Sequence, residues 1–85
     1  MLYEVYMRLS DDLVAEIRFL SLFNLESQQE GVKVHANADA ELIAAADRLY
    51  QKGIISQPDG GYLTDLGVEL AEHTQKMLMI LQSHC

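Results

Sequence analysis

The sequence predicts a small α+β fold that is mainly α-helical, with a short β-hairpin and a long C-terminal helix. Apolar residues recur at helical spacing in three stretches of the chain. A Pro-Asp-Gly-Gly turn at residues 58–61 separates two short β-rich segments. With 85 residues, of which 49% are hydrophobic, the chain has room for one core. We therefore expect a single domain over residues 10–85, preceded by a segment, residues 1–9, whose order the sequence does not decide.

The first helix is expected to begin at Ser10. A hydroxyl followed by Asp11 and Asp12 suits the free N–H groups and the positive end of a helix. The apolar spacing carries this helix to about Asn24. Its expected core face consists of Leu13, Ile17 and Leu20, with Val14, Phe19 and Phe23 beside them. One helical turn over residues 25–30 and a short strand over residues 32–35 should follow.

The second helix has Asn37 and Asp39 as alternative caps and ends before Gly53, a residue that adopts positive φ easily. Its helical stripe consists of Leu42, Ile43, Ala46, Leu49 and Tyr50. The residues on either side of the Pro-Asp-Gly-Gly turn, Ile54–Gln57 and Tyr62–Leu63, predict a short hairpin.

The last helix should start at Thr64 and extend to about Ser83, with Gly67 permitting close packing. The stripe expected to face inward consists of Leu66, Leu70, Met77, Leu78 and Leu81, with His73 on it. The far half of this helix is apolar on nearly all sides, so either a second subunit or the N-terminal segment should cover it. We favour a homodimer whose interface consists of Met77, Leu78, Ile80 and Leu81.

Residues 42–70, read as helix, hairpin and helix, resemble the back half of a winged helix. The carrying motifs are Leu49-x-x-Lys52-Gly53-Ile54 and Leu63-Thr64-x-x-Gly67. From about Asp12 onward the chain also resembles a small, functionally uncharacterised bacterial family described as DNA-binding, through residues 29–35 and 57–67. The resemblance implies a winged-helix-like domain that regulates transcription, with the helix before the hairpin in the major groove of duplex DNA. The basic and amide side chains available for that contact are Arg48, Lys52, Gln51 and Lys33.

The charge distribution argues against strong DNA binding. Thirteen acidic residues face six basic ones, which gives a net charge of −7, whereas proteins that bind duplexes use basic surfaces. Asp39 and Glu41 lie at the start of the candidate recognition helix, and Asp59 lies at the hairpin tip. Any DNA contact should therefore be weak. The alternative is a winged-helix scaffold used for protein–protein interaction, with an acidic surface that meets a basic partner.

No residue pattern indicates catalysis, a cofactor or a metal centre. His35, His73 and His84 do not pair at metal-ligand spacing on one helix, and there is no Cys-x-x-Cys motif. The single cysteine, Cys85, cannot form a disulfide framework, and no apolar run approaches the ~20 residues of a membrane span. We therefore expect a non-enzymatic cytoplasmic protein that does not enter membranes.

Overall fold

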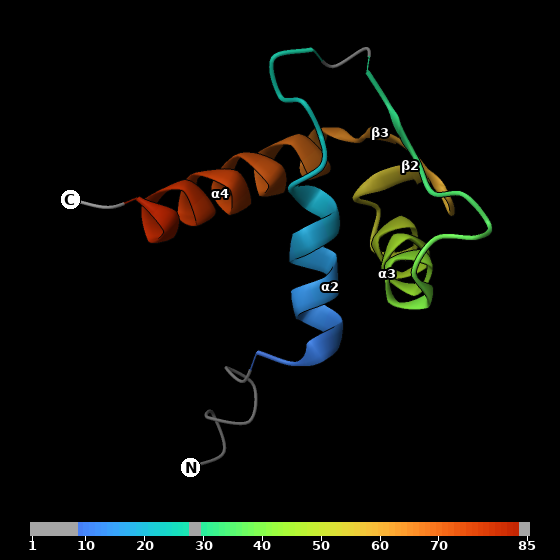
Figure 1. The fold of residues 1–85 in the computed structure, drawn as a ribbon. Coiled ribbons are helices and arrows are strands. Elements are labelled where there is room, and N and C mark those ends of the chain that lie inside the picture. The colour runs from blue at the N-terminus through green and yellow to red at the C-terminus, as the bar shows by residue number, and fades with distance from the viewer. Residues whose placement is uncertain (1–8, 28–29, 84–85) are drawn as a thin grey trace.

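The computed structural model describes residues 9–27 and 30–83, where helices pack on a three-stranded antiparallel sheet (Figure 1). The predicted α+β class, the hairpin and the long C-terminal helix are confirmed. Most of the segment 1–9, together with His84 and Cys85, lies outside the described residues. In chain order the elements are α2 (Asp11–Leu20), β1 (Val32–Lys33), α3 (Ala40–Gln51), β2 (Ile55–Gln57), β3 (Gly60–Leu63) and α4 (Asp65–Gln82).

The sheet has the order β1-β3-β2, so the second strand of the hairpin is central. The expected turn at residues 58–61 is shorter in the structure, because Gly60 and Gly61 belong to β3. Both glycines have positive φ, and a side chain at Gly60 would overlap the carbonyl group of Val32. These glycines let β1 approach the hairpin, with Val32 opposite Gly61 and Lys33 opposite Gly60.

The starts of α2, α3 and α4 agree with the sequence prediction. The Ser10 hydroxyl accepts a hydrogen bond from the Leu13 N–H at 3.2 Å, and the Asp39 carboxylate accepts one from the Glu41 N–H at 3.1 Å. Asp39 is therefore the cap of α3.

The end of α2 was predicted wrongly, because the helix stops at Leu20. The side-chain amide of Gln75 on α4 donates to the carbonyl oxygens of Leu20 at 3.1 Å and Phe23 at 2.8 Å. These bonds join the end of α2 and the turn that follows it to α4. The strand expected over residues 32–35 is also shorter, ending at Lys33.

The core lies where α2, α3 and the hairpin meet the first half of α4. Its buried cluster consists of Phe19, Leu20, Phe23, Val34, Ala46, Leu49, Ile54, Ile55 and Ala71. The rings of Phe19 and Phe23 meet edge to face, with their centroids 5.6 Å apart. Parts of the predicted stripes lie outside this core, since Leu13, Ile43 and Tyr50 are exposed. These helices bury small side chains instead, such as Ala15 and Ala45.

The inner face of α4 also differs from the prediction. Small residues line it, because Gly67, Ala71 and Thr74 are buried while Leu66 and Leu70 are exposed. His73, predicted on the inner stripe, is exposed as well. A methyl group at Gly67 would overlap the carbonyl oxygen of Ile54, so the helix lies too close to the hairpin for a large side chain. The large residues consequently remain outside.

Thr64 joins the hairpin to α4 through three contacts. Its hydroxyl donates to the carbonyl oxygens of Gly53 at 2.6 Å and Ile54 at 3.1 Å, and it accepts from the Gly67 N–H at 3.1 Å. We expect Thr64→Ala to lower the free energy of unfolding by about 1–2 kcal/mol, because the helix cap and the hydroxyl's bonds to the Gly53 and Ile54 carbonyls are lost together. Thr64→Ser retains the hydroxyl and should stay near the native value. Equal loss in both variants, measured by urea denaturation, would contradict this role of the hydroxyl.

Candidate functional site

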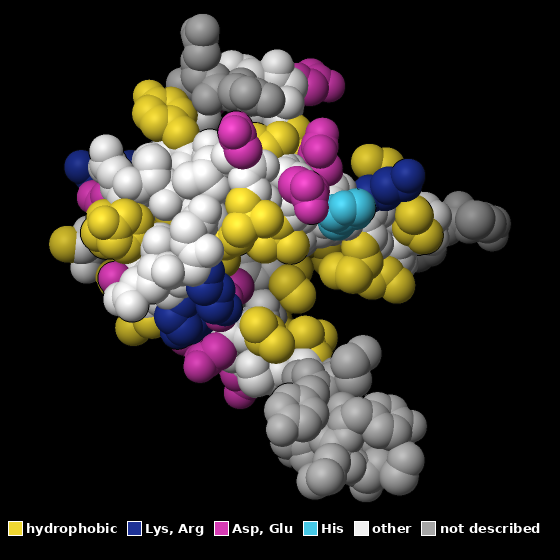
Figure 2. Space-filling model, turned by 180° about the vertical axis from the view of Figure 1, so that it is seen from behind, with side chains coloured by type: hydrophobic (Ala, Val, Ile, Leu, Met, Phe, Trp, Pro, Cys, Tyr) yellow, Lys and Arg dark blue, Asp and Glu magenta, His cyan; other side chains and the backbone are white. Residues whose placement is uncertain are grey.

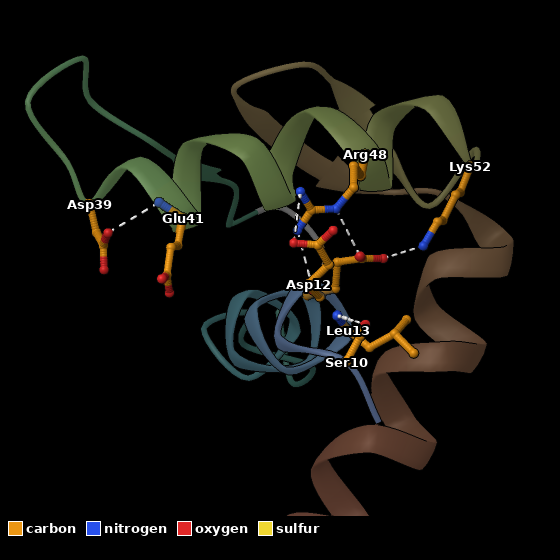
Figure 3. Close-up of polar contacts among 8 residues, drawn as sticks. Ser10, Asp12, Leu13, Asp39, Glu41, Arg48 and Lys52 are labelled. Atoms are coloured by element: carbon orange, nitrogen blue, oxygen red, sulfur yellow. Dashed lines mark hydrogen bonds and ion pairs between the residues drawn. The ribbon is translucent and has the colours of Figure 1, made fainter. Parts of the chain in front are cut away.

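Two of the three basic residues expected to contact DNA, Arg48 on α3 and Lys52 at its C-terminal cap, point toward α2 (Figure 3). The Arg48 Nε donates to one carboxylate oxygen of Glu16 at 2.9 Å. The Lys52 Nζ donates to the other oxygen of the same carboxylate. Both cations therefore share a single intramolecular partner, which the sequence analysis did not identify.

Glu16 is buried, and only 7% of its side chain is exposed, against 29% for Arg48 and 49% for Lys52. Arg48 also donates to the backbone carbonyl of Asp12 at 3.2 Å and lies 3.8 Å from its carboxylate. A carboxylate in a protein interior is tolerated when charged hydrogen-bond donors satisfy it. We name Asp12, Glu16, Arg48 and Lys52 the α2–α3 charge cluster. Its hydrogen bonds and ion pairs join α2 to α3.

The other two predicted DNA contacts also have partners within the chain. The Gln51 amide donates to the Asp47 carboxylate at 3.2 Å, one helical turn away on α3. The Lys33 ammonium lies 3.9 Å from the carboxylate of Asp59 at the hairpin turn. The predicted DNA-contacting residues therefore do not form one surface, because Lys33 contacts the hairpin whereas Arg48 and Lys52 contact α2.

The solvent-exposed side of α3 is acidic and apolar. Asp39 and Glu41 lie at its start (Figure 3). Asp47 is exposed further along the helix. Ile43 and Tyr50 are also exposed on this helix. Phosphate groups would meet carboxylates over much of α3, which disfavours contact with a duplex.

A second surface, formed by apolar side chains, runs along α4. Leu66, Leu70, His73, Met77 and Ile80 recur at alternating steps of four and three residues and so share one helix face. We name these five residues the α4 row. The exposed fractions of its four apolar members are 54% for Leu66, 36% for Leu70, 43% for Met77 and 63% for Ile80. Such a run of large apolar side chains on a surface is typical of an interaction site.

The second half of α4 extends away from the other elements as an arm (Figure 1), and hydrophobic side chains gather on it (Figure 2). Of the predicted interface residues, Met77 and Ile80 belong to the α4 row, and Leu81 beside them is 72% exposed. Leu78 is half-buried and follows Gly67, Ala71 and Thr74 at helical spacing, on the face turned toward the core.

Within the described residues, no helix combines the length and apolar character needed to cross a bilayer.

A comparison with models of known protein families finds a match for this chain. A model described as a family of unknown function, DUF5669, covers residues 7–82. The chain belongs to this family. No curated protein and no solved structure matches it. Because the DUF5669 description names neither a ligand nor an activity, the surfaces of this DUF5669 chain are the guide to its function.

The sequence does contain a signal for the missed residue, Glu16. Asp12 and Glu16 are one helical turn apart on α2, and Arg48 on α3 has the same spacing from Lys52, the C-cap of that helix. Two acidic residues and two basic residues with matching spacing can pair across two packed helices.

In the described part of this DUF5669 chain, no group of three or more His, Cys, Asp and Glu side chains is arranged to hold a metal ion.

Proposed function

We propose that the chain is a non-catalytic protein-interaction module on a winged-helix-like scaffold, and that it binds its partner through the α4 row. The observation that carries this proposal is the exposure of four large apolar side chains along one face of α4. Leaving such a face in water is unfavourable, and covering it with another apolar surface would contribute roughly 25 cal/mol per Å² buried. Binding of a partner at this face is therefore favoured by the burial of apolar surface that is exposed to water in the isolated chain.

The element order supports the winged-helix-like part of the proposal. A helix precedes the hairpin, another follows it, and β1 adds a third strand next to β3. One difference weakens the DNA-reading version of this scaffold. Between Lys33 and Ala40 the chain forms only a turn, where a helix-turn-helix would have its first helix.

The α2–α3 charge cluster favours the interaction role over DNA binding. Arg48 and Lys52 would have to leave the buried Glu16 carboxylate before they could neutralise phosphates. Breaking a buried pair leaves an uncompensated charge and costs several kcal/mol, on the order of 3–5 for a fully buried pair. The net charge of −7 adds a further repulsion from any polyanion.

The DNA-reading alternative is tested by titrating the chain with a labelled random duplex at about 50 mM salt, where electrostatic binding is strong. We expect no measurable change in fluorescence anisotropy. Two results together would support DNA binding over the interaction role: binding that weakens steeply as salt rises, and a loss of that binding in the variant that combines Arg48→Gln with Lys52→Gln. This variant should first be checked for native circular dichroism, because these residues also hold α2 and α3 together.

The interaction role is tested with a photoreactive amino acid in place of Met77, followed by irradiation of living cells and mass spectrometry. We expect crosslinked products at this position that name the covering chain, whether a second copy or another protein, including a basic one. The same residue in place of Glu41, exposed at the far end of α3, serves as the control. If position 77 yields no more product than position 41, the α4 row is not an interaction surface.

A further inference from the structure

We infer that the occupant of the α4 row is a second copy of this chain, whose α4 packs antiparallel on the first. This inference rests on the proposed function and names the partner of the same site. Two charged residues, Glu69 and Lys76, lie beside the row. Glu69 precedes Leu70 and Lys76 precedes Met77, so both charges lie on one flank of the row, seven residues apart.

Over residues 67–74 the opposite flank of the row is closed by the chain itself, whereas Leu81 further along it is exposed. Gly67 and Thr74, which occupy that flank, are buried against the body of the domain. Glu69 and Lys76 are both exposed. A helix that packs on the row therefore meets Glu69 and Lys76 at its open edge and the domain body at the other edge.

Antiparallel pairing places each of these charges beside the opposite charge of the second copy. When two identical helices pack antiparallel about a twofold axis, the same flank of each faces the other. Glu69 of one copy then lies beside Lys76 of the second copy, and the pair occurs twice. The same register brings Leu66 opposite Met77 and Leu70 opposite His73. Because the arrangement is symmetric, each contact occurs twice, which gives two ion pairs, two Leu66–Met77 contacts and two Leu70–His73 contacts.

Parallel pairing does not use the charges. In that arrangement the flank of Glu69 and Lys76 on one helix faces the opposite flank of the other, so Glu69 would meet Thr74 and Lys76 would meet Leu81. Neither contact joins opposite charges, and each charge would lose part of its hydration without compensation. The flank charges thus favour the antiparallel dimer.

Charge reversal tests this arrangement on the full chain by sedimentation equilibrium. Glu69→Lys alone and Lys76→Glu alone each convert two attractions into two repulsions. We expect each variant to dimerise about tenfold more weakly at low salt, as surface ion pairs of this kind allow. An equimolar mixture of the two variants restores both attractions, and so does the double variant. Both should recover affinity to within about threefold of the native chain.

Glu41→Lys is the matched control, because it makes the same charge change on an exposed position of α3, outside the α4 row and its flank. Its dimer affinity should stay within about threefold of the native value, and thermal unfolding should confirm that every variant folds. Unchanged affinity in both single reversals, or no recovery on mixing, would overturn the antiparallel pairing. A native chain that stays monomeric at about 1 mM would overturn the second copy as occupant. Crosslinks from position 77 to another protein would then still support the interaction role.

Discussion

Glu16→Ala is expected to lower the free energy of unfolding by about 2–3 kcal/mol, which is less than the full cost of breaking a buried ion pair. The substitution removes the carboxylate that both Arg48 and Lys52 contact across the α2–α3 interface. The two cations keep part of their hydration, since 29% of the Arg48 side chain and 49% of the Lys52 side chain are exposed. That residual hydration reduces the loss.

Urea denaturation of the native chain and the variant measures this effect. Glu41→Ala is the control, because it removes an exposed carboxylate from α3 and should change stability by no more than about 0.5 kcal/mol. Glu16→Gln keeps an oxygen that can accept from the Arg48 Nε, so we expect an intermediate loss. If Glu16→Ala were as stable as Glu41→Ala, the α2–α3 charge cluster would not hold the two helices together.

Gly67→Ala should destabilise the fold by about 2–3 kcal/mol, although alanine is intrinsically the better helix former. The added methyl group would overlap the carbonyl oxygen of Ile54 and come within 3.2 Å of the Leu63 side chain. The backbone oxygen has no freedom to rotate away. Either α4 must move off the hairpin or the hairpin must distort, and both changes loosen the core around Ala71.

Gly53→Ala separates the steric effect from glycine's conformational effect. Gly53 has a φ of 78°, and a methyl group there would meet nothing within 4 Å. Its replacement should cost about 1–2 kcal/mol through backbone strain alone. Gly67 has no such strain, so helix propensity on its own predicts that Gly67→Ala gains about 1 kcal/mol. A thermal melt in which Gly67→Ala is more stable than the native chain would contradict the close approach of α4 to the hairpin.

Local signals in the sequence were sufficient for the caps, the hairpin and the start of α4. The Asp39 and Thr64 side chains bond to N–H groups two and three residues away, so neighbouring residues alone determine these caps. Gly53 has the positive φ expected of a residue that ends a helix. These features do not depend on which elements pack together.

The inner faces of the helices could not be predicted in the same way. Helix α4 has a stripe of small residues next to a row of large ones, and hydrophobicity alone favours the large ones for the core. The structure buries the small stripe, because Gly67 allows α4 to approach the backbone of Ile54. That approach is a tertiary contact, and the spacing of residues along one helix does not report it.

The candidate DNA contacts were predicted mainly from their charge, which can be read from the sequence. The residues that they contact in the folded chain cannot be read from it. Arg48 and Lys52 resemble a solvated basic helix end until α2 brings Glu16 to them. Glu16 was overlooked because a carboxylate among core residues is uncommon. Matching acidic and basic spacings on the two helices provide the signal that could have predicted this pairing.

Pairing of two copies through α4 can be measured most directly as a distance between spin labels. A nitroxide is attached at Glu72→Cys or, separately, at Gln82→Cys, with Cys85→Ser in both proteins, and the dipolar coupling between copies is recorded. The antiparallel dimer predicts a short separation at position 72, near the twofold axis. At position 82 it predicts about 30 Å, from the rise of 1.5 Å per residue. Equal short distances at both positions would indicate parallel helices, and no coupling at either would contradict the dimer.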